Sequence, residues 1–224
     1  MVANNIFNGT KGKNTGFLMV NWGWGIAVFA GVLVAFKSGG HLNPAVTIGL
    51  LIAGKMPGAT FGTIATYIGA QFLGAFVGAA LCWLTYKVQF DMEQPEGYKL
   101  GVFSTGPAER SYAWNLITEI IATFVLVFVV LIVGYQGAAG NMGWLNALGV
   151  AILIVGIGAS LGGPTGYAIN PARDLGPRIW HAIMPVKDKG SSDWGYSWVP
   201  VVGPIIGGVV AALLFLAIGP VFPA

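Results

Sequence analysis

The sequence predicts an all-α membrane protein built as an inverted repeat, and three observations support this fold class. Apolar residues make up 55% of the 224 residues and charged residues 8%, against about 25% charged residues in a soluble domain. The tripeptide Asn-Pro-Ala occurs twice, once in each half of the chain, at 43–45 and 170–172. Charged side chains are absent from four long stretches, 18–36, 59–86, 120–172 and 194–224.

The uncharged stretches can hold five full membrane spans, because a spanning helix needs about 20 apolar residues. We expect these spans at about 18–36, 60–86, 114–134, 143–161 and 198–218. The second half of the chain then has three spans and the first half two. A counterpart of the missing first span is expected before residue 18, but residues 1–17 are too polar to supply it.

Each Asn-Pro-Ala begins a stretch that is too short to cross a bilayer, 43–53 and 170–182. Asn is a good N-cap and Pro is favoured at the first helical position, so both stretches are predicted to be half-helices that begin deep in the membrane. Three full spans separate the motifs, so the half-helices enter from opposite faces and their N-termini can meet near the midplane. Matching breaks in two halves indicate a substrate path at that depth.

We interpret residues 1–224 as a single domain. It has a first repeat at about 1–90, a second repeat at about 114–224, and between them a linker at about 87–113 that we expect to be a solvated loop. The repeats also share a glycine spacing after each motif, at Gly74–Gly78 and Gly203–Gly207. Glycines four residues apart let helices approach closely in lipid.

The motifs carry a family resemblance. GGHLNPAVTIG at 39–49 and GYAINPARDLGP at 166–177 resemble the major intrinsic proteins, the aquaporin and aquaglyceroporin channels, and the resemblance covers essentially the whole chain. Within that family the chain looks most like a bacterial glycerol facilitator. The resemblance implies an aquaporin-like fold with six spans and two re-entrant half-helices, and a homotetramer with one pore per subunit. It also implies a multi-pass protein of the bacterial plasma membrane.

The two motif asparagines, Asn43 and Asn170, are expected to cap the half-helices and to point amide N–H groups into the pore. Each helix N-terminus also brings roughly half a positive charge, and two such ends facing one pore oppose cations and protons. The simpler alternative is that each Asn-Pro only starts a helix. The other residues of the two Asn-Pro-Ala motifs are Pro44, Ala45, Pro171 and Ala172.

Arg173 ends a long uncharged stretch, and a charge inside a membrane is costly and usually functional. The resemblance places Arg173 in a selectivity filter with Trp22, Gly158 and Tyr167. Its guanidinium suits two substrate hydroxyls, while a structural salt bridge with Asp174 or Glu119 is the alternative. Trp24 competes with Trp22, which could instead be an interfacial anchor.

The other two filter positions bear on the solute. Gly158 stands where water-selective members carry histidine, so we expect a constriction wide enough for a polyol. Tyr167 stands where glycerol facilitators usually have phenylalanine, which makes the filter more polar.

The remaining site residues have supporting or backbone roles. We expect Glu119 to accept hydrogen bonds from the loop of the second motif, and Asp174 to support the half-helix. His41 is expected to be a packed side chain. The pore-lining carbonyls are expected at Gly39, Gly40, His41, Gly163, Pro164 and Thr165.

These features predict a passive channel for glycerol and other small uncharged solutes, with water, that excludes ions and protons. The alternatives are a water-selective aquaporin and a structural, non-conducting member of the family. We expect no enzyme activity, no cofactor, no metal site and no nucleic-acid partner. The expected partners are the permeants, the lipid bilayer and further copies of the chain.

Overall fold

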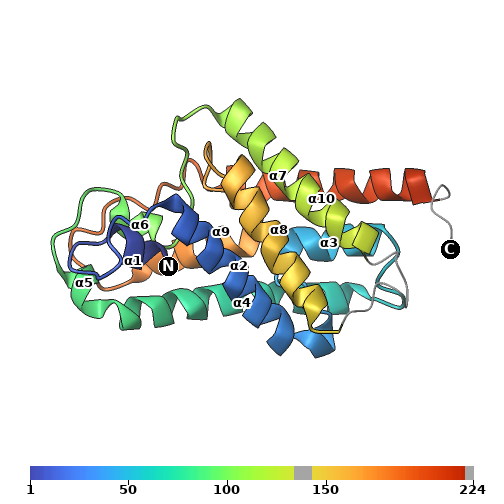
Figure 1. The fold of residues 1–224 in the computed structure, drawn as a ribbon, viewed down its shortest axis with the longest axis horizontal. Helices are drawn as coiled ribbons and strands as arrows, with labels where there is room; N and C mark the ends of the chain where they lie inside the picture. The colour runs from blue at the N-terminus through green and yellow to red at the C-terminus, as the bar shows by residue number, and fades with distance from the viewer. Residues whose placement is uncertain (134–142, 220–224) are drawn as a thin grey trace.

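A computed structural model describes residues 1–133 and 143–219. These residues form helices and loops without a strand, and some of the long helices run along the long axis of the molecule while others cross it obliquely (Figure 1). The helices in chain order are α1 (Val2–Ile6), α2 (Phe17–Val34), η1 (Phe36–Ser38), α3 (Pro44–Ile52), α4 (Phe61–Thr85), α5 (Lys87–Asp91), α6 (Tyr98–Gly101), α7 (Tyr112–Val133), α8 (Leu145–Leu161), α9 (Pro171–Ile183) and α10 (Val199–Ile218).

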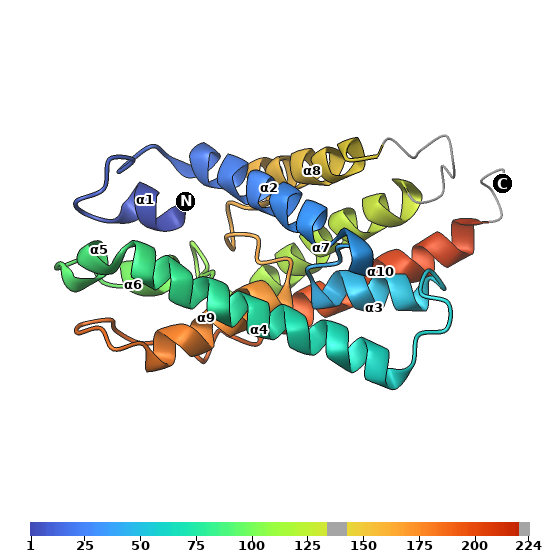
Figure 2. The ribbon, with the colours of Figure 1, turned by 90° about the horizontal axis from the view of Figure 1, so that it is seen from below.

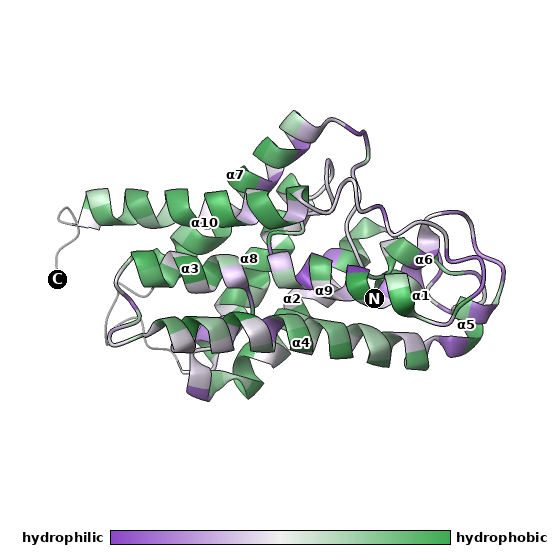
Figure 3. Ribbon diagram, turned by 180° about the vertical axis from the view of Figure 1, so that it is seen from behind, coloured by the Kyte–Doolittle hydropathy of each residue, from purple (hydrophilic) through white to green (hydrophobic). Residues whose placement is uncertain are grey.

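The five predicted spans are confirmed as helices α2, α4, α7, α8 and α10. Four of them are long and apolar enough to cross a membrane, and α8 is an apolar helix of 17 residues. Residue 134, the expected end of the third span, lies outside the described residues. Figure 3 shows the hydrophobic colouring along these helices and more hydrophilic segments around α5 and α6. The chain is therefore a multi-pass membrane protein.

The two short stretches are confirmed as half-helices, α3 with nine residues and α9 with 13. Each starts with proline at its first position, and the preceding asparagine caps it. Figure 2 shows α3 and α9 on opposite halves of the long axis, with their N-terminal ends toward the middle. The inverted repeat predicted from the motifs is thus present in space.

The glycine spacing has different surroundings in the two halves. A Cβ on Gly203 would lie 2.7 Å from the Glu119 Cβ, and one on Gly207 would collide with the Ile120 carbonyl oxygen. These glycines allow α10 to pack tightly against α7. Gly74 and Gly78 of α4, in contrast, meet no atom within 4 Å in the part of the chain that the structure describes.

Residues 87–113 are not the solvated linker that the sequence predicted. They contain α5 and α6, and Phe90 and Phe103 are buried in one hydrophobic cluster with Phe7. The Phe90 ring lies 4.8 Å from the Phe7 ring and 5.3 Å from the Phe103 ring, measured between centroids. Burial of these rings holds the segment against α4 and α9, so it belongs to the folded body of the protein.

Candidate functional site: a pore between the half-helices

The two motif asparagines join the half-helices at their N-termini. Asn43 Oδ1 accepts from the Ala45 N–H at 2.9 Å, and Asn170 Oδ1 accepts from the Ala172 and Arg173 N–H groups at 3.0 and 3.1 Å. Each side-chain amide also donates to the opposite loop, Asn43 to the Ile169 carbonyl at 2.7 Å and Asn170 to the Leu42 carbonyl at 2.9 Å. Each cap therefore fixes its own helix and the loop of the other half.

The loop before each asparagine has an unusual backbone. Leu42 has φ 54° and Ile169 has φ 44°, in the left-handed region that residues with a side chain rarely adopt. This conformation places each carbonyl where the asparagine of the other half can donate to it. The same strain at matching positions marks a backbone held for a purpose.

Glu119 of α7 holds the second loop. It is 1% exposed, and Oε1 accepts from the Thr165 hydroxyl at 2.7 Å and from the Ala168 N–H at 2.9 Å. Oε2 accepts from the Ile169 N–H at 2.8 Å. These three hydrogen bonds to one buried carboxyl group hold the loop in its bent path, in which Tyr167 has φ 39° and Ile169 has φ 44°.

Arg173 lies beside Trp24, not beside Trp22. Its guanidinium carbon is 4.1 Å from the centroid of a Trp24 ring, and its Nη1 donates to the Phe103 carbonyl at 3.0 Å. Trp22 is 47% exposed on another side of α2, because two helical positions differ by roughly 200° around the axis. The structure thus contradicts the expected contact between Trp22 and Arg173, and the aromatic ring beside Arg173 is that of Trp24.

Tyr167 and Gly158 pack against each other. A Cβ on Gly158 would lie 2.6 Å from the Tyr167 Cζ and 2.7 Å from the Asn21 Oδ1. The missing side chain of Gly158 thus lets the tyrosine ring and the Asn21 amide approach α8. These neighbours already fill the space beside Gly158, and the expected wider constriction stays a prediction.

The carbonyls of Gly39, Gly40 and His41 accept no hydrogen bond from the described residues. Residues 166–168 stand in the same positions before Asn170 as 39–41 do before Asn43. Their carbonyls also accept no hydrogen bond from the described residues. Pro164 was predicted to line the pore, but its carbonyl accepts from the Ala108 N–H at 3.0 Å. One lone pair of the Pro164 carbonyl is thus used by the Ala108 N–H, and a pore-lining role for Pro164, as for Gly163 and Thr165, stays a prediction.

Comparison with known proteins identifies the family. A family model described as Major intrinsic protein matches residues 2–215. The chain belongs to the major intrinsic protein family. It is 51% identical to the "Probable glycerol uptake facilitator protein" of Thermotoga maritima, over 96% of this chain and 90% of that protein. It is 49% identical to "Glycerol uptake facilitator protein 3" of Lactiplantibacillus plantarum, over 96% of this chain and 88% of that protein.

A solved structure gives the same answer for the fold. The aquaglyceroporin from Plasmodium falciparum matches with a TM-score of 0.81 and 35% identity, over 96% of this chain and 86% of that one. The all-helical architecture described above is thus the fold of this major intrinsic protein, and both halves of the repeat take part in the match.

The ion pair of Asp174 differs from the salt bridge with Arg173 that the sequence left as an alternative. Asp174 pairs with Arg178, not with Arg173: Oδ1 accepts from Arg178 Nε at 2.9 Å and Nη2 at 2.8 Å, and both side chains are fully buried. Asp174 Oδ2 accepts from the N–H and the hydroxyl of Thr105 at 2.7 and 2.8 Å. In this major intrinsic protein the carboxylate of Asp174 is therefore taken by Arg178, and Arg173 donates to the Phe103 carbonyl.

Sequence reasoning missed Arg178, although its spacing was a usable signal. It follows Asp174 by four residues on the short helix α9, a spacing that brings two side chains together. Its Nη1 also donates to the Ser192 carbonyl at 2.8 Å and its Nη2 to the Thr105 carbonyl at 2.9 Å. A second arginine, Arg110, lies at the surface before α7. Its hydrogen bonds to the Asp193 carboxylate raise the pKa of its guanidinium.

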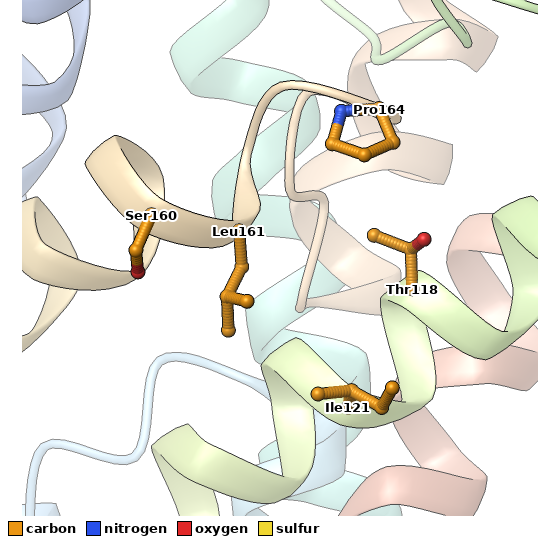
Figure 4. Close-up of a pocket in the computed structure, with 5 residues that line it drawn as sticks. All are labelled: Thr118, Ile121, Ser160, Leu161 and Pro164. Carbon is orange, nitrogen blue, oxygen red and sulfur yellow. The ribbon is translucent and has the colours of Figure 1, made fainter.

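Two cavities lie beside the loops that precede the two half-helices. One of about 370 Å³ reaches His41, whose Nδ1 lies 3.1 Å from the Thr47 hydroxyl, and is also lined by Lys55 and Tyr67. The other, of about 150 Å³, lies between α7 and the end of α8 (Figure 4) and is lined by Thr118, Ile121, Ser160, Leu161 and Pro164. Among the described residues, no group of three or more His, Cys, Asp or Glu could hold a metal ion.

Proposed function

We propose that this chain is a passive channel for glycerol and other small uncharged solutes, with water permeation. The observation that carries the proposal is the pairing of Arg173 with Trp24 at 4.1 Å, next to two asparagine-capped half-helices. An aromatic wall suits the C–H face of a polyol, and the guanidinium suits its hydroxyls. Relatives about 50% identical are named glycerol uptake facilitators.

The asparagines supply the donors at the midplane. A side-chain amide has two N–H groups, and each asparagine uses one on the opposite loop. The second N–H of Asn43 and of Asn170 is available to a passing hydroxyl or water. Free carbonyls before each asparagine, at Gly39, Gly40 and His41 and at 166–168, accept in return, so a polyol exchanges its hydration for matched partners.

Ions are excluded by the same parts. Two helix N-termini with partial positive charge and the Arg173 guanidinium oppose cations, and a bare amide cannot replace the full hydration shell of an ion. The selectivity filter we propose is Trp24, Gly158, Tyr167 and Arg173, with Glu119 and Asp174 as supporting residues. The chain acts as a transporter down a gradient and not as an enzyme. It needs no cofactor and assembles as a homotetramer in the lipid bilayer.

A water-selective pore is the second candidate, and one observation favours it. The Tyr167 ring and Asn21 fill the space that Gly158 leaves, and a filled space narrows the passage. The two candidates differ in whether glycerol enters, so they can be separated by one measurement.

The test is osmotic. Purified protein is reconstituted into liposomes, which are challenged with glycerol or with an impermeant sugar. We expect shrinkage followed by fast re-swelling with glycerol only, and slow re-swelling in protein-free liposomes. Water flux without glycerol entry supports the water-selective candidate, and the absence of both fluxes refutes both.

A further inference from the structure

Two buried polar atoms near Arg173 have no hydrogen-bond partner among the described residues. They are Asn21 Oδ1 and the Tyr167 hydroxyl. Asn21 is 1% exposed and Tyr167 is 4% exposed. Native proteins rarely leave such groups unsatisfied without a reason. Leucine and phenylalanine would fill the two places with similar volume and no unpaired oxygen.

The two atoms belong to one place in the molecule. A Cβ on Gly158 would lie within 2.7 Å of both the Tyr167 Cζ and the Asn21 Oδ1. Asn21 comes from α2, Gly158 from α8 and Tyr167 from the loop before α9. The hydroxyl end of the ring and the amide oxygen therefore meet over the same glycine.

This place adjoins the filter. Asn21 precedes Trp24 by three residues on α2, so the two side chains lie on one face of the helix, about one turn apart. Trp24 stacks on Arg173, which puts Asn21 on the side of α2 that faces the guanidinium. The chemistry of the pair is complementary, since an amide oxygen only accepts, whereas a phenol hydroxyl donates and accepts.

We propose that Asn21 and Tyr167 form a hydroxyl-binding subsite in the wall of the filter. Asn21 Oδ1 accepts from a hydroxyl of a small polyol, and the Tyr167 hydroxyl donates to the oxygen of that same group. The subsite makes Asn21 a specificity-determining residue. It rests on the proposed function and deepens it, because it selects for the number of hydroxyls a solute carries.

The test compares glycerol with 1,3-propanediol, which has the same three-carbon chain but lacks the central hydroxyl. Liposome re-swelling gives the ratio of the two rates, after subtraction of protein-free liposomes. We expect Tyr167→Phe and Asn21→Leu each to lower the glycerol-to-propanediol ratio about fivefold, the effect of one lost hydrogen bond. The double variant loses both hydrogen bonds and should lower the ratio further than either single variant.

The matched control is Asn146→Leu. Asn146 Oδ1 is also buried without a partner, but it lies 12 residues before Gly158 on α8, roughly 18 Å along the axis. The glycerol-to-propanediol ratio of the Asn146→Leu variant should stay at the wild-type value. Tyr167→Phe removes a single oxygen and keeps the ring, and water permeability measured on the same liposomes reports that each variant still forms a channel.

The outcomes separate this proposal from the proposed function. If the wild-type protein passes no glycerol, the channel function and the subsite both fail. If it passes glycerol and both single variants keep the wild-type ratio, the subsite alone is overturned. A variant that shifts the unfolding temperature but not the ratio means that the pair holds a resident water, which also overturns the subsite. A double variant that keeps the wild-type ratio likewise overturns the subsite.

Discussion

At the residue scale, the two tryptophans of α2 provide a matched pair. Trp24 lies under the Arg173 guanidinium and Trp22 is half-exposed. A cation–π contact contributes about 0.5–1 kcal/mol at exposed sites and about 2 kcal/mol or more when desolvated. We therefore expect Trp24→Ala to lower the glycerol rate roughly three- to tenfold and to admit larger polyols, because the filter loses a wall and Arg173 loses its support. Liposome re-swelling with glycerol and a four-carbon polyol measures both effects.

Trp22→Ala is the control for this prediction. Trp22 has the same side chain on the same helix, so the two variants share any effect that the loss of a tryptophan has on α2 itself. Equal effects of the two substitutions, or a larger effect at Trp22, would contradict the placement of Trp24 in the filter.

Glu119 gives a second prediction at this scale. Glu119→Gln keeps the volume but turns one acceptor into a donor, which faces the Thr165 hydroxyl or a backbone N–H. We expect a loss of about 1–3 kcal/mol in the free energy of unfolding, together with reduced flux. Thermal unfolding in detergent measures the first. Glu109→Gln, in the exposed loop before α7, should leave the unfolding temperature unchanged, and a similar drop there would refute the assignment.

Some of the site could be predicted from residues alone. The asparagines and Arg173 were found because short motifs fix their chemistry and position. Trp22 was preferred to Trp24 because the sequence does not give the rotation of α2 about its axis. Asn21 was missed for a related reason: one polar residue in an apolar run has no meaning until α8 and the loop before α9 are packed against it.

At the scale of elements, the glycine pairs differ in a testable way. Gly207→Ala places a methyl group against the Ile120 carbonyl, so α7 and α10 must separate. We expect a loss of about 1–3 kcal/mol, the usual effect of overpacking. Gly78→Ala adds a methyl group at an open position of α4 and should be neutral or stabilise the helix by about 0.5–1 kcal/mol. Chemical unfolding in detergent, followed by helix signal, compares the two.

This comparison also has a contrary outcome. Equal destabilisation by both alanines would mean that the α4 face with Gly78 is packed in the membrane as closely as the α10 face. Gly74→Ala repeats the test one helical turn away from Gly78, where the described residues leave the same open space.

The helices were more predictable than the segment between the repeats. Span ends and half-helices follow from uncharged length and Asn-Pro capping, which are local signals. The 87–113 segment contains charges and short apolar groups without a helical period, so it was interpreted as solvated. Its fold depends on distant partners such as Phe7 and Asp174, which no local pattern reveals.

At the scale of the whole molecule, one buried arginine connects three parts of the chain. Arg178 of α9 bonds to Asp174 on its own helix, to the Thr105 carbonyl of the segment between the repeats, and to the Ser192 carbonyl of the loop before α10. Two residues before Thr105 on that segment, the Phe103 carbonyl accepts a hydrogen bond from Arg173 Nη1. The arginine therefore supports the same segment that holds the Arg173 side chain.

We expect Arg178→Gln to destabilise the protein by about 3–5 kcal/mol, because it leaves the Asp174 carboxylate buried without its charge partner. The same variant should also lower glycerol flux, since the 102–111 segment that holds Arg173 loses its attachment to α9.

Arg110→Gln is the matched control. It breaks an ion pair with Asp193 that is about as short, 2.7 Å, but that lies at the surface with side chains 44% and 27% exposed, so it should cost less than about 1 kcal/mol. Detergent unfolding and liposome flux are measured on both variants. Equal losses in the two would place the support of the filter elsewhere, whereas a loss of flux confined to Arg178→Gln would tie the filter to this buried pair.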